Sequence, residues 1–180
     1  MTIDPNAPHG SRVIESVETT AEAPATLGFE DFYRTSYASV ARALVIVAGS
    51  MAGAEELAQD AFARTYERWD RVAGMGSPAG YVYRAALNLH RSRLRRASVA
   101  LRHAGHGAVP TSVPEPGVRH EVREMLASLP RAQREALMLV EWLGYSAEEA
   151  ARILGVRPSS VRGRVHRARQ SLRERFGGDE

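Results

Sequence analysis

The 180-residue sequence contains no cysteine and no lysine, so each of its 24 basic residues is an arginine. Without cysteine, disulfide bonds, thiolate nucleophiles and zinc ribbons are excluded. Without lysine, the Walker phosphate-binding loop and enzymes that work through a Schiff base are excluded as well. Long apolar runs are also missing, because the longest, Ala43 to Ala48, is much shorter than the ~20 residues that cross a bilayer. We therefore expect no membrane insertion.

Residues 1–28 hold three prolines and many small polar residues, a composition that predicts a disordered amino-terminal extension. The same segment has no basic start followed by an apolar stretch, so it does not resemble a secretory signal. We therefore expect a cytoplasmic protein.

Arginine is unevenly distributed, although the net charge of the whole chain is only +3. Residues 77–107 carry six arginines and no acidic residue, and residues 152–180 carry eight arginines against three acidic residues. The segments before these two blocks are mildly acidic. This alternation favours two separate contacts with a polyanion, each beside a surface suited to a protein partner, although a solvated charged face explains either block alone.

Apolar residues recur at helical spacing along the chain, and no stretch alternates like a β-strand, so the sequence predicts an all-α fold. We expect two small helical domains joined by a flexible linker. The first domain is expected over residues 29–102. Its three helices are expected to run from Phe29 to Gly49, from just after Gly53 to about Trp69, and from Pro78, after an N-cap at Ser77, to about Arg96.

The predicted linker, residues 103–117, contains three glycines and three prolines, which neither continue a helix nor pack. The second domain is expected over residues 118–176, followed by a short tail at residues 177–180. Within this domain, Ser146 and Glu149 have the spacing of a capping box, and Gly155 closes the short helix that they begin.

The last predicted helix follows a serine N-cap at Ser159 or Ser160 and buries one stripe, which consists of Val161, Val165, Ala168, Leu172 and Phe176. A short helix, a glycine turn and a longer arginine-rich helix form a helix-turn-helix arrangement. The start of the last helix and the face away from the stripe carry the candidate readers of duplex DNA: Ser159, Ser160, Arg162, Gly163, His166 and Arg167. Arginine suits bidentate contact with guanine, and a helix start offers N–H groups to phosphate. A solvated basic helix is the alternative.

The third predicted helix of the first domain carries a second basic ridge, which consists of Arg84, Asn88, Arg91 and Arg95. Asparagine can read a base edge, so this ridge suits single-stranded nucleic acid. Tyr81 and Tyr83 are able to stack on an unpaired base, but for both of them a place in the core of the bundle is the preferred interpretation.

Four segments in order along the chain resemble the extracytoplasmic-function (ECF) sigma factors of bacterial RNA polymerase. They are AEELAQDAFAR at 54–64, PAGYVYRAALNLHRSRLRR at 78–96, LPRAQR at 129–134, and YSAEEAARILG at 145–155 running into VRGRVHRAR at 161–169. The resemblance covers residues 29–176. It implies sigma domain 2 for the first predicted domain and sigma domain 4 for the second.

This resemblance implies a protein that binds core RNA polymerase and directs initiation at promoter DNA. The helix bearing Glu56, Gln59 and Asp60 would lie against the clamp helices of the polymerase β′ subunit, and the β subunit would be a further contact. An anti-sigma factor is another expected partner. We expect no enzymatic activity, no cofactor and no bound metal.

The resemblance also implies two promoter-reading sites. The loop at residues 71–77, together with Asn88 and Ser92, matches the family's pocket for a flipped base of the −10 element, beside the basic ridge. The family's −35 readers match Arg162, Gly163, His166 and Arg167.

Three features depart from the family pattern: Gly163 replaces the common serine, Tyr81 replaces the usual tryptophan, and residues 1–28 have no counterpart. The runner-up interpretation is a stand-alone helix-turn-helix regulator, in which residues 29–100 would be a sensing or dimerising bundle. A sensor has no use for the basic ridge, whereas a promoter-melting domain does, so the ridge favours a sigma factor. An enzyme is a distant third interpretation.

Overall fold

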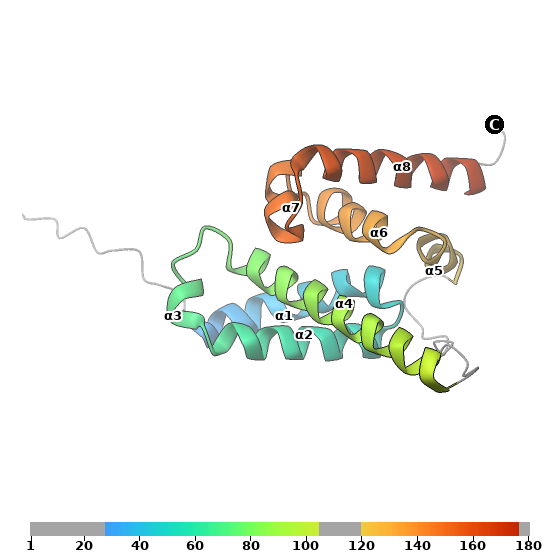
Figure 1. Cartoon of the computed structure of the whole chain (residues 1–180). Helices are drawn as coiled ribbons and strands as arrows, with labels where there is room; N and C mark the ends of the chain where they lie inside the picture. The colour runs from blue at the N-terminus through green and yellow to red at the C-terminus, as the bar shows by residue number, and fades with distance from the viewer. Residues whose placement is uncertain (1–27, 105–119, 177–180) are drawn as a thin grey trace, which may run out of the picture.

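The computed structural model describes residues 28–104 and 120–176, which form helices joined by short turns, with no strand among them (Figure 1). The amino-terminal unit consists of α1 (Phe29–Ala48), α2 (Met51–Tyr66), α3 (Trp69–Val72) and α4 (Pro78–Ala104). The carboxy-terminal unit consists of α5 (His120–Ala127), α6 (Arg131–Leu137), the π-helical turn η1 (Met138–Trp142), α7 (Ala147–Leu154) and α8 (Pro158–Phe176). The all-α prediction is confirmed.

The described ranges leave out several segments on which predictions were made. Residues 1–27 of the predicted amino-terminal extension, the predicted tail and residues 105–117 of the predicted linker lie outside them. Helix α4 continues to Ala104, so residues 103 and 104 are helical rather than linker.

A tight turn joins α1 to α2. Gly49 has a φ of 80°, the left-handed conformation that glycine adopts readily, and its N–H donates to the Val45 carbonyl at 2.9 Å. The Ser50 hydroxyl then accepts the Gly53 N–H at 3.1 Å and caps α2. Helix α2 therefore begins at Met51 rather than after Gly53, because the serine cap outweighs the flexibility of one glycine in the first turn.

Aromatic residues pack together where α1 starts and α2 ends. The rings of Phe32 and Trp69 are stacked with their centroids 5.1 Å apart, and Phe62 lies buried 5.7 Å from Phe32. Helix α2 ends at Tyr66, and the chain bends so that Trp69 begins the short helix α3. The second predicted helix is thus too long by three residues, and the bend after Tyr66 accompanies the stacking of Trp69 on Phe32.

Two caps organise the helix-turn-helix. Both hydrogen bonds of the Ser146–Glu149 capping box are present, and Gly155 closes α7 with a φ of 69°, as predicted. The start of α8 differs from the prediction because Pro158, whose fixed φ suits a first helical position, begins the helix. Ser159 and Ser160 therefore lie in the first turn of α8, and neither is its N-cap.

The π-helical turn changes which side chains of the α6–η1 segment face the core. Met138 and Leu139 are buried, whereas Val140 and Leu143, which follow them in the chain, are only half-buried. A π-turn inserts one extra residue and so shifts every later position around the axis. At the other end of the unit, Leu172 is only half-buried and Phe176 is 49% exposed, so the buried stripe of α8 ends at Ala168 rather than at Phe176.

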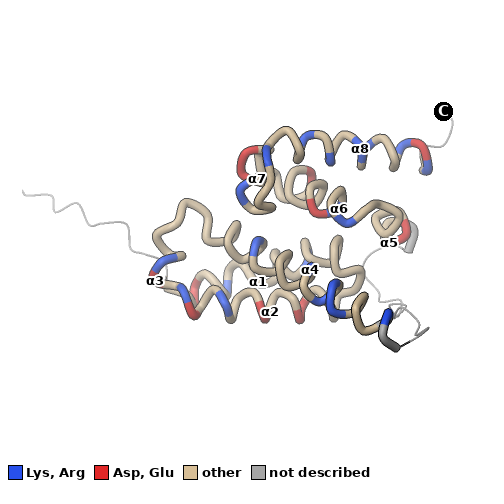
Figure 2. The backbone as a smooth tube through the Cα atoms, in the orientation of Figure 1, with Lys and Arg blue, Asp and Glu red and all other residues tan. Residues whose placement is uncertain are grey.

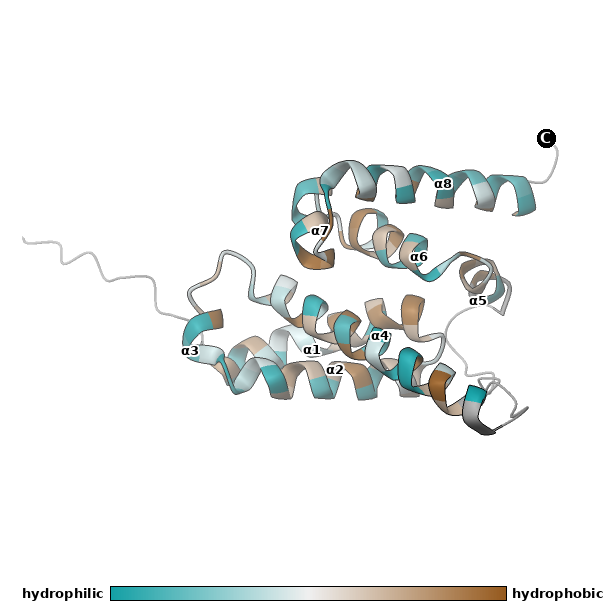
Figure 3. Ribbon diagram, viewed as in Figure 1, coloured by the Kyte–Doolittle hydropathy of each residue, from teal (hydrophilic) through white to brown (hydrophobic). Residues whose placement is uncertain are grey.

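The two units share one hydrophobic core. Buried apolar residues of α1, α2, α4, α6, η1, α7 and α8 form a single cluster, in which α4 contacts α7, and α1 contacts both α6 and η1. Figure 3 shows apolar residues on the side of α7 that faces the amino-terminal unit. Of the helices described, none combines the length and the apolar character needed to cross a membrane.

Candidate nucleic-acid interface

Helix α8 is anchored through one face and open on the other. Val161, Val165 and Ala168 are buried, whereas His166 and Arg167 are exposed, so the three-to-four-residue spacing of the sequence separates core from surface as predicted. Arginine residues line this outer helix in Figure 2. The arrangement leaves a basic surface of α8 available to a polyanion.

For two of the predicted duplex readers, Arg162 and Arg167, neighbouring residues affect where the guanidinium lies. The Arg162 guanidinium donates to the Glu148 carboxylate at 2.9 Å, which ties α8 to the first turn of α7. The pKa of Glu148 is lowered by its own backbone N–H at the helix start and by the bond from Arg162. A Cβ atom at Gly163 would lie 3.4 Å from Nη1 of Arg167, so the Arg167 guanidinium lies along the space that glycine leaves.

Helix α4 divides its polar residues among three directions. Arg84, Asn88 and Arg95 are exposed, and Ser92 is half-buried beside them. Arg93 turns the other way, toward α2, and Arg91 turns toward the carboxy-terminal unit. The predicted ridge is therefore present except at Arg91.

Arg91 forms a two-pronged pair with a buried carboxylate of α6. Its Nη2 lies 2.6 Å from Oε2 of Glu135 and its Nε lies 3.1 Å from Oε1. The Glu135 side chain is 2% exposed and the Arg91 side chain 19%. Arg131, one turn earlier on α6, lies 3.5 Å from Oε1 of Glu135. Arg91 is a predicted DNA contact, but in this structure its guanidinium is not free, because it is hydrogen-bonded to Glu135.

Sequence reasoning missed Glu135 as a structural partner. A signal was present, because Glu135 lies within the apolar spacing formed by Ala132, Ala136 and Leu139. An isolated carboxylate on such a stripe indicates a buried ion pair, since a buried charge requires a partner. The identity of that partner, 44 residues earlier in the chain, was not accessible from spacing.

The predicted polymerase-binding residues lie together on the outer face of α2. Glu56, Gln59 and Asp60 are all exposed. Arg93 of α4 lies 3.0 Å from Glu56 and 2.7 Å from Asp60, a partner that the sequence analysis also missed. The acidic face of α2 is thus held in place by the same helix that carries the basic ridge.

The tyrosines of α4 occupy different environments. Tyr83 is 3% exposed, and burial raises its pKa to about 12, helped by the nearby Tyr145 and opposed by a hydrogen bond with Ser39. Its ring meets that of Tyr145 edge-on at 6.2 Å. Tyr81 is half-buried, and its hydroxyl accepts a hydrogen bond from Arg68 at 3.1 Å. The core placement is confirmed for Tyr83 and only partly for Tyr81.

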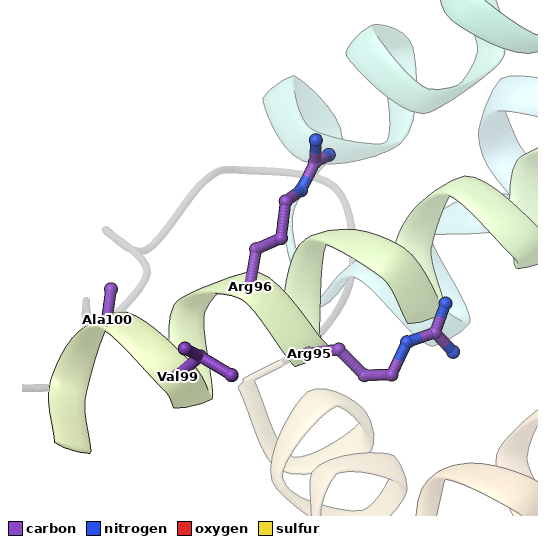
Figure 4. A pocket seen from close by; sticks show the side chains of 4 residues that line it. All are labelled: Arg95, Arg96, Val99 and Ala100. Carbon is purple, nitrogen blue, oxygen red and sulfur yellow. The ribbon is translucent and has the colours of Figure 1, made fainter. Parts of the chain in front are cut away.

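A surface hollow of about 460 Å³ lies along the far end of α4, lined by Arg95, Arg96, Val99 and Ala100 (Figure 4). All four residues come from one helix, and the two arginine side chains point in different directions. The hollow therefore does not bring polar groups together as a catalytic site would. Within the described residues, no group of three or more His, Asp or Glu side chains is placed to hold a metal ion.

Comparison with known families matches both units separately. The Sigma-70 region 2 family matches residues 32–99, and the Sigma-70 region 4 family matches residues 119–172. Among curated proteins, the RNA polymerase sigma-E factor of Streptomyces avermitilis is 30% identical over 151 residues, which cover 82% of this chain and 84% of the relative. The ECF RNA polymerase sigma factor SigE of Mycolicibacterium smegmatis is 29% identical over 93% of this chain and 67% of its own length.

Solved structures agree on the fold. The sigma factor RpoE of Bartonella quintana, determined in complex with the anti-sigma factor NepR, superimposes with a TM-score of 0.76 at 21% identity, covering 84% of this chain and 98% of that one. CnrH, determined with the cytosolic domain of CnrY, gives a TM-score of 0.58 at 24% identity and covers 84% of this chain and 89% of CnrH.

Proposed function

Because the chain belongs to the ECF sigma factors, which bind core RNA polymerase and direct initiation at promoter DNA, we propose that α4 reads the −10 element and α8 the −35 element. In this division of labour, residues 29–102 act as sigma domain 2 and residues 118–176 as sigma domain 4. The family matches at residues 32–99 and 119–172 support these boundaries. A stand-alone regulator is not favoured, because both units match sigma regions.

The observation that carries the −35 assignment is the open outer face of α8. Arg162, His166 and Arg167 are exposed on the second helix of a helix-turn-helix, the position that enters the major groove in this motif. Gly163 lets backbone and DNA approach closely, and Arg167 supplies a fork of donors for a guanine edge. Ser159 and Ser160, in the first turn, are placed to donate to phosphate.

The −10 assignment is supported by the exposed part of the ridge on α4. Asn88 offers both a donor and an acceptor to the edge of a flipped base, and Ser92 offers a hydroxyl one turn away. Arg84 and Arg95 flank them and attract the phosphates of a separated strand. Arg91 contributes to the same surface once it is released from Glu135.

For the polymerase contact, we assign Glu56, Gln59 and Asp60 of α2 to the clamp helices of the β′ subunit, with the β subunit as a further contact. The exposed carboxylates of this face would meet a basic surface. An anti-sigma factor is a further proposed partner, supported by the RpoE neighbour, which was determined with NepR. We place the protein in the cytoplasm, where polymerase and promoter DNA are found, and assign it no enzymatic activity.

Run-off transcription with purified core polymerase tests this function. Core enzyme plus the protein, on a pool of genomic fragments from the source organism, should yield discrete transcripts that core enzyme alone does not make. The same fragments with the protein alone should show weak binding, because two small units bind tightly only when their geometry is fixed. Tight sequence-specific binding without polymerase, and no new transcripts with it, would support a stand-alone regulator instead.

A further inference from the structure

One face of α4 is covered by the carboxy-terminal unit. At Gly80, an added Cβ would lie 3.6 Å from Cδ1 of Ile153 on α7. The ring of Tyr83 contacts the ring of Tyr145. The Arg91 guanidinium pairs with Glu135 of α6. These positions follow one another at intervals of three and eight residues, so they share one side of the helix. The contact between the units therefore runs along α4 for about three turns.

This covered face lies next to the proposed −10 reading face. At 100° per residue, the mean direction of Arg84, Asn88 and Arg95 around the helix axis differs from the mean direction of the covered stripe by only about 75°. A DNA strand that follows the reading face would thus run beside α6 and α7. Arg91 lies within the covered stripe, and its Nη1 lies only 3.4 Å from Oδ1 of Asn88.

The Arg91–Glu135 pair uses the chemistry by which arginine binds phosphate. A guanidinium offers the same two parallel N–H groups to a carboxylate and to a phosphate, so it cannot serve both in that way at once. Arg131 of α6 also pairs with Glu135, but at 3.5 Å and from a partly exposed position, so its contact is looser than the 2.6 Å contact of Arg91. Separation of the two units would return the Glu135 carboxylate to water and leave the Arg91 guanidinium free.

We propose that the Arg91–Glu135 pair is a latch that holds the two units closed and, in the free protein, restricts access of a single-stranded −10 segment to α4. This inference rests on the proposed role of α4 and adds a regulation of that site. Because linkage is reciprocal, whatever binds Arg91 favours opening, and whatever separates the units, such as simultaneous attachment of both to polymerase, favours DNA binding.

Glu135→Gln tests the latch, since it removes the carboxylate charge at nearly the same volume and leaves all proposed DNA contacts in place. The chain contains no cysteine, so cysteines introduced at the exposed positions Ala63 on α2 and Arg173 on α8 carry a pair of fluorescent dyes without further changes. Energy transfer between the dyes should fall in the Glu135→Gln variant. Binding of a single-stranded oligonucleotide from the −10 region of a promoter found by run-off should strengthen between about 5- and 150-fold, the usual range of such coupling.

Glu141→Gln is the control for the loss of a carboxylate from an ion pair that does not join the two units. It removes a carboxylate from a pair of the same length, 2.6 Å to Arg169, but both partners lie within the carboxy-terminal unit. This variant should keep the energy transfer and the DNA affinity of the parent protein. If Glu135→Gln leaves either quantity unchanged, or if Glu141→Gln changes both equally, the latch is wrong.

Two further measurements distinguish a folding defect, a failure of the latch and a failure of the proposed function. If Glu135→Gln does not fold, as judged by circular dichroism, then Arg91→Gln must lower the energy transfer by itself; unchanged transfer in that variant overturns the latch. In holoenzyme, where polymerase holds the units, Glu135→Gln should transcribe like the parent protein. If the parent holoenzyme makes no transcript from any fragment, the proposed function fails, whereas the energy-transfer result still decides whether the pair holds the units together.

Discussion

At the scale of single residues, Gly163 shows how one missing side chain affects stability. It lies inside α8, where glycine costs up to about 1 kcal/mol relative to alanine. An added Cβ would meet only the far end of the flexible Arg167 side chain, at 3.4 Å. Gly163→Ala should therefore stabilise the fold by about 0.5–1 kcal/mol and raise the Tm by about 2 °C, measured by thermal melting.

Gly155→Ala is the control of opposite sign. Gly155 has a φ of 69°, which a residue with a Cβ adopts only with strain. The same substitution there should lower the Tm although no atom lies within 4 Å of the added Cβ. If both variants shift the Tm in the same direction, backbone conformation does not explain the two glycines.

His90 on α4 gives a prediction about pH. Burial lowers its pKa from the ordinary 6.5, Arg134, Arg131 and Arg93 act in the same direction, and Glu135 opposes them. The unfolded chain therefore takes up a proton at a pH where the folded protein resists it, so stability is full above pH 6.5 and is lost as the pH falls through the lowered pKa. Melting curves should show this loss, and His90→Gln should reduce it.

The matched control is His166→Gln, which removes an exposed histidine on α8. This variant should melt with the same dependence on pH as the parent protein over the same range. Equal slopes in all three proteins would show that His90 is not the group responsible.

Residue exposure was largely predictable, whereas partners were not. Spacing alone separates Val161 and Val165 from His166 and Arg167, because a helix repeats every 3.6 residues. The pairing of Arg91 with Glu135 depends on how two distant helices meet, and periodicity within either helix contains no information about that.

At the scale of helices, α2 joins a packed face to an acidic one. Asp60 lies on the acidic face, 2.7 Å from Arg93, and remains about half exposed. Asp60→Arg should weaken assembly with core polymerase by about tenfold or more, because it sets a positive charge against a surface expected to be basic. A pull-down titration with core enzyme measures this, with circular dichroism to verify an intact helix content.

Asp31→Arg is the control, because it reverses another exposed, ion-paired carboxylate, on α1, where Asp31 lies 3.0 Å from Arg34. It should leave polymerase binding unchanged. Equal loss in both variants would indicate a general effect of charge, and no loss in Asp60→Arg would remove α2 from the polymerase interface.

Helix ends were predictable where a specific residue determines them. Gly49, the Ser146–Glu149 box and Gly155 mark the expected ends, because each supplies a particular conformation or hydrogen bond. The prediction for the start of α8 was wrong. Pro158 and the two serines after it are all suited to a helix start, and the proline begins the helix. The π-turn after Leu137 carries no such local signal.

At the scale of the whole molecule, sequence spacing indicated two helical units but not their shared core. Each unit buries its own stripe, and in addition α1 and α4 pack against α6, η1 and α7. The basic surfaces of α4 and α8 thus belong to one closed arrangement (Figures 1 and 2). In the proposed division, α4 of the amino-terminal unit reads the −10 element and α8 of the carboxy-terminal unit reads the −35 element.

The most direct test of that division compares Arg167→Ala and Asn88→Ala in run-off transcription on two templates. On a full promoter, both holoenzymes should initiate less well, since loss of a base contact costs about 1–3 kcal/mol. On a fork template that keeps the −10 strand but lacks the −35 element, the Arg167→Ala holoenzyme should match the parent and the Asn88→Ala holoenzyme should remain defective. Equal defects of both variants on the fork template, or a defect in neither, would contradict the assignment of the −10 element to α4 and the −35 element to α8.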